Sequence, residues 1–489
     1  MQSNSSKKVS FNKLTIIFLA KLKIMFRVII SILFVLVSIF YGSERSTSIA
    51  DDKIEISLKE AVKIAFTNSP NIKAKYAEWQ AAHHQALAVK GSRYPQVNAY
   101  ADYLRLSDPV AVVPIKGFGG NPPYFSRDLY KTGLAVTYPL YKGGGLRADF
   151  KKAVHEEKAQ KGLLTAYRHN LVAQLTNTFY TIIYLKSLLD AQNMTFEALK
   201  AQRKDAQLAF NVGRIPKLDL MEIDTQLSSQ HQDIVATQQA ILRSKQQLAW
   251  LMGLRPKEKF ILKGDLEKEA QKLLRSPDIR RILMEEFNNE EIFQIIENRP
   301  DIRAAKQRVL AAKQAVKSAK SLHLPSLALV GDYGRHAGSG LKGNEEVWSF
   351  GINLNLNLFS GKTITAKIAQ AQSKLLEAKN NLKGLEDEAY FQVVNAISLL
   401  KESLERENLA KSVQRTAYEA FRIEKLKYTK GAGTISDVLK AQAEWNRAKA
   451  SLLKALYDEV AAIIAYQLHT GTILKNFEDY KKEGLGENG

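Results

Sequence analysis

Apolar and polar residues alternate strictly in one stretch of the C-terminal half. Ser, Gly or Asn separates each pair of large apolar residues between Trp348 and Leu358. A period of two puts all the apolar side chains on one face of a β-strand. The apolar face suits contact with lipid, and the face of small polar residues suits a water-filled lumen. A soluble sheet would usually carry charged residues on its water-exposed face. The predicted lipid-facing side chains are Trp348, Phe350, Ile352, Leu354, Leu356 and Leu358.

Three further segments are candidate partner strands: 97–106, 132–140 and 327–333. Four strands are too few to close a barrel, and an open sheet edge is not viable in lipid. We therefore expect the chain to oligomerise through this sheet.

Elsewhere the period changes to that of a helix. No proline interrupts 145–210 or 363–428, and each stretch has one internal glycine. About 65 helical residues would form a rod of roughly 100 Å. A glycine-bearing turn follows each rod, and a second helical pattern then runs to about Met252 or His469. The pattern predicts two long antiparallel helical hairpins.

The two halves of the chain repeat each other. Asn68-Ser-Pro70 returns 230 residues later as Asn298-Arg-Pro300, and the turn Gly213–Asp219 returns 218 residues later as Gly431–Asp437. The matching motifs keep the same order in both halves, and the distance between them changes once, from 230 to 218 residues. This pattern indicates a duplicated unit. We predict a signal peptide over 1–50, a first repeat over 51–290, a second over 291–471 and a C-terminal tail over 472–489.

Basic residues precede an apolar run at 28–40, and Ser48-Ile-Ala50 offers small residues for cleavage. This order predicts a secretory signal peptide. The segment is long, and Met25 would begin a signal of conventional length, so Met1 and Met25 both stand as possible starts. The chain has no cysteine, which excludes disulfides and acylation of a cysteine thiol.

The net charge of +21 could suggest nucleic-acid binding. Without residues 1–50, 64 basic residues stand against 49 acidic ones. Their spread along helical patterns indicates a solvated surface, so we expect no nucleic-acid partner.

The sequence suggests neither an enzyme nor a metal protein. His83, His84, His155 and His169 lack the spacing of metal ligands, and no catalytic arrangement is identifiable. Gly361-Lys-Thr363 resembles the end of a phosphate-binding loop, and Gly143–Gly145 resembles a phosphate cradle. Both stand where a strand must bend into a helix, so we interpret them as joints. No catalytic residue, cofactor or metal is predicted.

Several motifs together resemble the TolC-like outer-membrane efflux proteins. They include Ser57-Leu-Lys-Glu-Ala61, Asn68-Ser-Pro70, Tyr138-Pro-Leu-Tyr-Lys-Gly143, and Gly-x5-Asp at each hairpin turn, and the second half carries equivalents. The resemblance covers about Ile56 to Gly471.

The resemblance implies a mainly α protein with a transmembrane β-barrel. Three protomers would give twelve strands and a long periplasmic tunnel of α-helical hairpins. The implied partners are two other copies of the chain, outer-membrane lipid, a periplasmic adaptor (membrane fusion) protein and an inner-membrane pump of the RND, ABC or MFS type. The implied location is the outer membrane of a Gram-negative-type cell, with a large periplasmic portion.

The resemblance also implies roles at the periplasmic entrance. Asp437 matches an aspartate ring, while Lys440 replaces the second aspartate of the family. Tyr428 and Asp219 match a pair that latches the entrance, and the latch arginine is Gly433 here. A second interpretation of Asp219 and Asp437 is that each carboxylate simply favours the positive end of a helix dipole.

We therefore expect a passive exit duct of a tripartite efflux or type I secretion system, and no enzyme. The alternative is a periplasmic coiled-coil scaffold without a pore.

Overall fold

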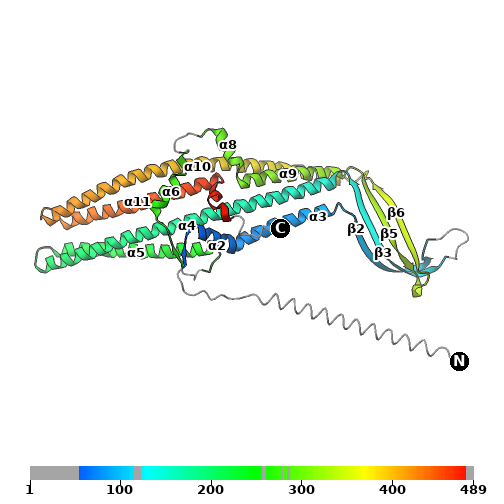
Figure 1. The fold of residues 1–489 in the computed structure, drawn as a ribbon, viewed down its shortest axis with the longest axis horizontal. Helices are drawn as coiled ribbons and strands as arrows, with labels where there is room; N and C mark the ends of the chain where they lie inside the picture. Colours follow the sequence, from blue (N-terminus) through cyan, green and yellow to red (C-terminus); the bar gives the residue numbers. More distant parts are fainter. Residues whose placement is uncertain are drawn as a thin grey trace, which may run out of the picture. The chain divides into compact units, whose positions relative to one another are not determined.

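A computed structural model describes residues 54–114, 123–255, 260–276, 279–280, 282 and 287–480. The predicted signal peptide and residues 481–489 of the predicted tail lie outside the described residues. Almost all described residues belong to one compact unit that begins at Glu55 (Figure 1).

Among the described residues, the first half contains a helical hairpin, three shorter helices, two long strands and two short strands. Its elements are β1 (Ile54–Ile56), α2 (Leu58–Asn68), α3 (Pro70–Gly91), β2 (Gln96–Ala111), β3 (Phe125–Lys142), α4 (Gly145–Asn211), α5 (Lys217–Leu251), β4 (Phe260–Leu262) and α6 (Leu266–Leu274). The second half repeats the order from α2 to α5 with α8 (Asn289–Glu297), α9 (Pro300–Ser321), β5 (Ser326–Ala337), β6 (Glu345–Asn355), α10 (Thr363–Thr429) and α11 (Ile435–His469). It also has η1 (Ser339–Leu341) between its two strands and η2 (Ile473–Tyr480) after α11.

Three pairs of corresponding helices have equal lengths in the two halves. α4 and α10 each span 67 residues, α5 and α11 each span 35, and α3 and α9 each span 22. The predicted rods therefore match to within about one residue, because no proline breaks them. The boundaries of the two repeats at 290 and 471 stay predictions.

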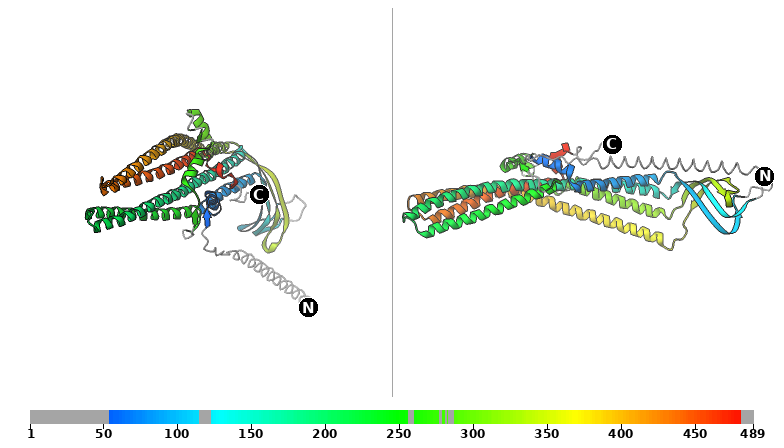
Figure 2. Two further views of the ribbon diagram at one scale, coloured as in Figure 1. Left: turned by 60° about the vertical axis from the view of Figure 1, so that its left-hand side comes forward. Right: turned by 90° about the horizontal axis from the view of Figure 1, so that it is seen from below.

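Each hairpin reverses at a glycine in the left-handed conformation. Gly213 follows α4 with φ +73°, and Gly431 follows α10 with φ +75°. A side chain disfavours this conformation, so glycine is the residue that ends each rod and lets the return helix start. Figures 1 and 2 show α5 lying along α4 and α11 lying along α10.

The two strand–helix joints have similar backbone conformations. Gly143 and Gly144 precede α4 with φ +59° and +80°, and Gly361 and Lys362 precede α10 with φ +57° and +65°. A Cβ on Gly143 would lie 2.5 Å from the Ser321 carbonyl oxygen. This crowding explains the glycine at position 143. The positive φ angles at both places support the interpretation of both motifs as joints.

The four long strands form one antiparallel sheet in the order β2-β3-β5-β6. The predicted partner segments all lie in it, and each observed strand is longer than predicted. The predicted segment 132–140 missed the start of β3, because Asp128 and Lys131 interrupt its apolar pattern.

The strand predicted over 348–358 is shifted in the structure. β6 covers Glu345–Asn355, so Leu356 and Leu358 lie beyond its end. The last pair of the ladder joins Asn355 to Ser326, and the residue before Ser326 is Pro325. Proline has no N–H to donate, which accounts for the end of the pairing. Inclusion of Leu356 and Leu358 in the strand was wrong.

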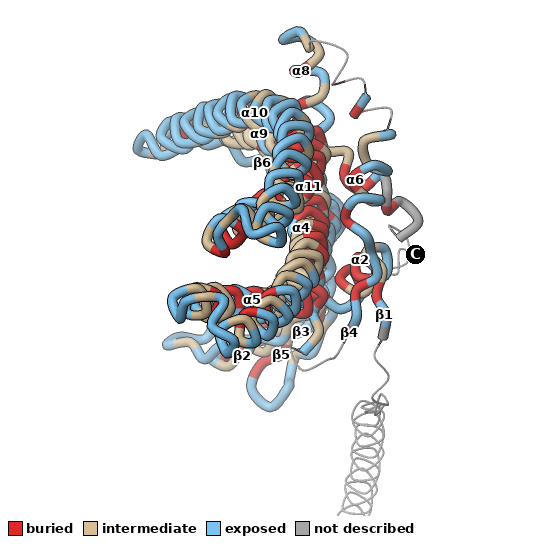
Figure 3. The backbone as a smooth tube through the Cα atoms, turned by 90° about the vertical axis from the view of Figure 1, so that its left-hand side faces the viewer, coloured by how far each residue is buried: buried red, intermediate tan, exposed pale blue. Residues whose placement is uncertain are grey.

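Small elements pack around the middle of the long helices. We call β1, α2, β4, α6 and η2 the collar; β1 and β4 form a two-stranded sheet within it. The main core joins the collar to α4 and α11 through residues such as Phe66, Phe179, Leu266, Ile464 and Phe477. Figure 3 shows buried residues gathered where α2 and α6 lie next to these helices. None of the described helices has the length and hydrophobicity that crossing a membrane requires.

Candidate functional site

One face of the four-stranded sheet is largely apolar and exposed. The register aligns Ala99, Leu134, Tyr333 and Trp348 across all four strands. Trp348, Phe350, Ile352 and Leu354 are each 65–73% exposed. The same face continues over its neighbours with Val97, Tyr103, Tyr130, Val136, Tyr138, Leu327 and Leu329. An exposed apolar surface of this extent indicates contact with lipid or with a partner.

The opposite face is mostly polar. It carries Asn98, Asp102, Lys131, Thr137, Asp332, His336, Ser349 and Asn353, as the strand registers show. The alternation that predicted β6 therefore extends across the whole sheet.

Pairs of charged residues end the apolar face at one end of the sheet, where β2 connects to β3 and β5 connects to β6. Arg105 lies opposite Asp128 at 3.6 Å, and Arg335 lies opposite Glu346 at 3.1 Å. Tyrosines and Trp348 stand just inside these pairs. From Tyr130 to Tyr138 the strand rises about 26 Å, which is close to the ~25 Å apolar band of a membrane barrel.

Two glycines in the middle strands leave room for a tyrosine side chain of β2 to cross β3. Gly133 pairs with Gly334, and a Cβ on Gly133 would lie 2.8 Å from the Tyr100 hydroxyl oxygen. The Tyr100 hydroxyl reaches across β3 and donates to Asp332 Oδ1 at 2.9 Å. Side chains at these two positions would block this contact. The two glycines therefore help to fix the position of β2 on the sheet.

The outer edges of this sheet are β2 and β6, and neither pairs on its outer side with another described strand. They are 16 and 11 residues long. Long unpaired edges are available for pairing with another chain.

The two hairpin turns lie together. Ile435, Val438 and Leu439 at the start of α11 pack with Leu199, Ala206 and Ile223 of the first hairpin. Tyr428 and Ile215 lie against this cluster. The structure therefore places all four predicted entrance residues in the region of these turns.

Asp437 caps its own helix. Its carboxylate accepts a 2.6 Å hydrogen bond from the Thr434 hydroxyl, and its backbone N–H donates to that hydroxyl oxygen at 3.2 Å. These bonds to Thr434, and then the charges of Lys440 and Lys427, hold the pKa of Asp437 below its usual value. This geometry supports the helix-start interpretation of Asp437. The sequence Thr434-Ile-Ser-Asp437 carries a capping-box signal that our sequence analysis missed.

Tyr428 and Asp219 interact electrostatically, and no hydrogen bond joins these two side chains. Burial, and then the charge of Asp219, raise the pKa of Tyr428. Burial, and then Glu222, raise the pKa of Asp219. The structure thus brings the predicted pair within electrostatic range, from different hairpins.

A buried arginine that the sequence analysis did not single out ties the second repeat together. Arg299 bonds both carboxylate oxygens of Asp301, at 2.7 and 3.1 Å, and also Gln392 and the His469 carbonyl. It therefore joins the start of α9 to α10 and to the end of α11. The repeated motif Asn298-Arg-Pro300 was the sequence signal that could have drawn attention to Arg299.

The described residues include no group of three or more side chains that could hold a metal ion. His83 lies 2.9 Å from Glu157, and His155 lies 2.8 Å from Gln307. These contacts give two of the histidines structural partners.

A two-faced sheet joined to long helical hairpins defines a class of outer-membrane channel proteins. Residues 61–254 and 292–472 match the family described as outer membrane efflux protein. The chain belongs to this family, and it is an outer-membrane protein with a large periplasmic portion.

Individual relatives agree with this assignment. The chain is 25% identical over 405 residues to outer membrane protein OprJ of Pseudomonas aeruginosa, covering 80% of this chain and 78% of that protein. It is 22% identical over 432 residues to outer membrane protein TolC of Vibrio cholerae, covering 85% and 91%.

Solved structures share the fold. The outer membrane protein VceC of Vibrio cholerae superimposes with a TM-score of 0.71 at 19% identity, covering 85% of this chain and 96% of that one. The CmeC outer membrane channel of Campylobacter jejuni gives 0.70 at 19% identity, covering 88% and 90%.

Proposed function

We propose that three copies of this chain form a passive exit duct across the outer membrane. The duct receives substrates from an inner-membrane pump through a periplasmic adaptor, in a tripartite efflux or type I secretion system. The pump supplies the energy, and the duct itself catalyses no reaction.

The observation that carries this proposal is the four-stranded sheet with an apolar face, a polar face and two unpaired edges. In lipid, the edges of β2 and β6 must pair, because an exposed backbone polar group costs several kcal/mol. Pairing β6 of one copy with β2 of the next satisfies both edges.

Three copies are what the resemblance to the TolC-like family implies, and the strand count supports that number. Two copies would give eight strands, and side chains fill the interior of a barrel of that size. Three copies give twelve strands and a wider interior, lined by the polar face. A scaffold without a pore would leave the apolar face without a role.

At the other end, the hairpin turns form the entrance in this proposal. Tyr428 and Asp219 hold the two hairpins of a protomer together, while three copies each of Asp437 and Lys440 set its charge. Because Lys440 follows one turn after Asp437, each acidic group has a basic neighbour.

The sheet proposal is tested by placing the same charge on its two faces. Leu354→Arg puts the guanidinium on the apolar face, where burial of its charge in lipid should cost free energy and reduce the amount of protein in the outer membrane. Asn353→Arg puts it on the polar face and is the matched control, because the two residues are neighbours in β6. It should insert normally and change ion selectivity.

Outer-membrane fractionation measures the first effect, and the reversal potential in a salt gradient measures the second. If both variants insert equally well, the apolar face does not meet lipid, and the scaffold interpretation replaces the duct.

A further inference from the structure

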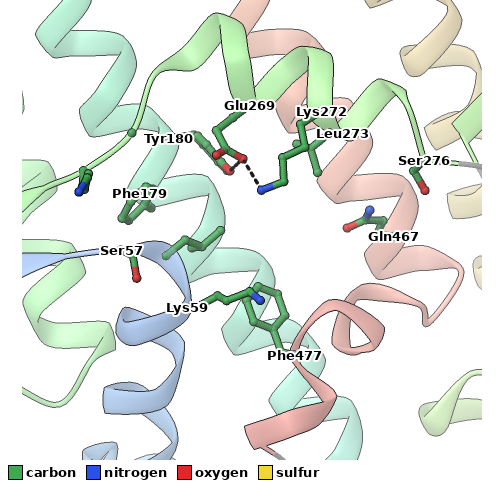
Figure 4. Close-up of a pocket in the computed structure, with 13 residues that line it drawn as sticks. Ser57, Lys59, Phe179, Tyr180, Glu269, Lys272, Leu273, Ser276, Gln467 and Phe477 are labelled. Carbon is green, nitrogen blue, oxygen red and sulfur yellow. Dashed lines mark hydrogen bonds and ion pairs between the residues drawn. The ribbon is translucent and has the colours of Figure 1, made fainter.

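The collar contains a pocket that the duct does not use. It has a volume of about 500 Å³ and lies between α2, α4, α6, α11 and η2 (Figure 4). None of its lining residues belongs to the four-stranded sheet or to the hairpin turns. Its size falls in the range of small-molecule sites.

The walls of the pocket are largely apolar and aromatic. Phe179 and Phe477 line it while being only 2% and 7% exposed, so packing holds both rings in place. Leu58 and Leu273 add aliphatic surface. At Gly264 the backbone runs so close to α4 that a Cβ would lie 2.5 Å from Ile183 Cδ1. These packed walls give a ligand a preformed surface to contact.

Three lysines and one glutamate also line the pocket. Glu269 accepts a 3.4 Å hydrogen bond from the Tyr180 hydroxyl and lies 3.7 Å from the Lys272 amine. Figure 4 shows Lys272, Glu269 and Tyr180 grouped on one side and Lys59 beside Phe477 on another. The carboxylate of Glu269, the one acidic group that lines the pocket, therefore already forms an ion pair with Lys272.

The other two amines lack such a partner. Within the described part of the chain, neither Lys59 nor Lys263 forms an ion pair. Lys263 acts electrostatically on Glu60, but the carboxylate of Glu60 is bound to Ser57 in the capping box of α2. Because these two ammonium groups have no ion-pair partner among the described residues, they give the pocket a net positive charge beside its apolar walls.

We propose that this collar pocket binds a small carboxylate with an aromatic or alkyl body. The positive charge of Lys59 and Lys263 would attract the carboxylate, and the body would lie against the aromatic walls formed by Phe179 and Phe477. An inorganic anion would leave the apolar walls uncovered, and a cation would be repelled by the two amines. None of the lining residues belongs to the four-stranded sheet or to the hairpin turns, so binding here and conductance are measured as separate properties.

The test compares two probes of equal shape. Naphthalene-2-carboxylate and naphthalene-2-carboxamide are titrated calorimetrically into the full chain in nanodiscs, and empty nanodiscs correct for binding to lipid. We expect saturable binding of the carboxylate, at least fivefold tighter than that of the carboxamide. Raising NaCl from about 50 to about 300 mM should weaken it, because salt screens exposed charges.

Variants locate the site. Lys59→Gln with Lys263→Gln should weaken carboxylate binding about five- to tenfold, as expected for two partly exposed charge contacts. Lys268→Gln is the matched control, because this lysine lies on α6 but pairs with Asp265 at 3.6 Å and does not line the pocket. It should bind like the unmodified chain.

Equal affinity for the two probes, equal loss in the control, or no heat beyond that of empty nanodiscs would overturn the proposal. The circular dichroism of each variant must match that of the unmodified chain. A failure of the duct proposal would appear in conductance and leave this titration unchanged.

Discussion

Glu459 is a fully buried acid in the second hairpin. Its side chain is 0% exposed, and neither carboxylate oxygen has a hydrogen-bond partner. Burial, and then the charge of Glu407 on α10, raise the pKa of Glu459 to about 7. Lys411 acts in the opposite direction, but it already pairs with Glu407 at 2.6 Å. The charged form of Glu459 is therefore unfavourable in the folded protein.

This environment predicts a pH-dependent stability. Because the folded pKa lies above the unfolded value of 4.5, the folded state holds the proton between these values. Stability should then fall as pH rises from roughly 4.5 to 7, by on the order of 2–3 kcal/mol. Glu459→Gln should remove this part of the dependence, as measured by melting temperature at pH 5 and pH 8.

Glu444→Gln is the control, because this residue is exposed on the same helix and pairs with Arg447. An identical pH dependence in the Glu459→Gln variant and the unmodified chain would show that Glu459 does not titrate in this range.

At the scale of elements, the contact between the two hairpins decides whether the turns stay together. An apolar cluster joins α4 and α5 to α11, and Tyr428, which packs against this cluster, interacts electrostatically with Asp219. Each hairpin also has its own internal contacts, such as the ion pair of Arg203 on α4 with Asp224 on α5. Each hairpin therefore has internal contacts that do not depend on the cluster between the turns.

Weakening the contact between hairpins should open the entrance. Tyr428→Phe with Asp219→Ala removes both polar groups, and we expect a higher single-channel conductance. Tyr418→Phe is the control for the tyrosine, because Tyr418 lies on α10 but packs on Trp445. Conductance that stays the same in the double variant would mean that this pair does not hold the entrance closed.

At the scale of the whole molecule, the sequence predicted the long elements best. The 67-residue helices α4 and α10 follow from long stretches without proline, ended by Gly213 and Gly431. Strand ends were predicted less well, since pairing through backbone groups continues past charged residues such as Asp128. The pairing of β5 with β6 stops at Pro325, so a residue outside β6 determines where β6 ends.

Contacts between distant side chains were not predictable from spacing alone. The collar pocket combines residues from Ser57 to Phe477, and Arg299 contacts a carbonyl 170 residues further along the chain. Asp437 shows the reverse case, because its role as a cap depends only on Thr434 three residues before it.

The central claim is that the assembled chain is a duct, and conductance across a planar bilayer tests it most directly. Purified protein, shown by mass to be a trimer and by circular dichroism to be rich in helix, is added to one side of the bilayer. The account predicts discrete, reproducible single-channel steps. A correctly folded trimer that inserts into lipid and conducts no ions, even with Tyr428→Phe and Asp219→Ala, would contradict it.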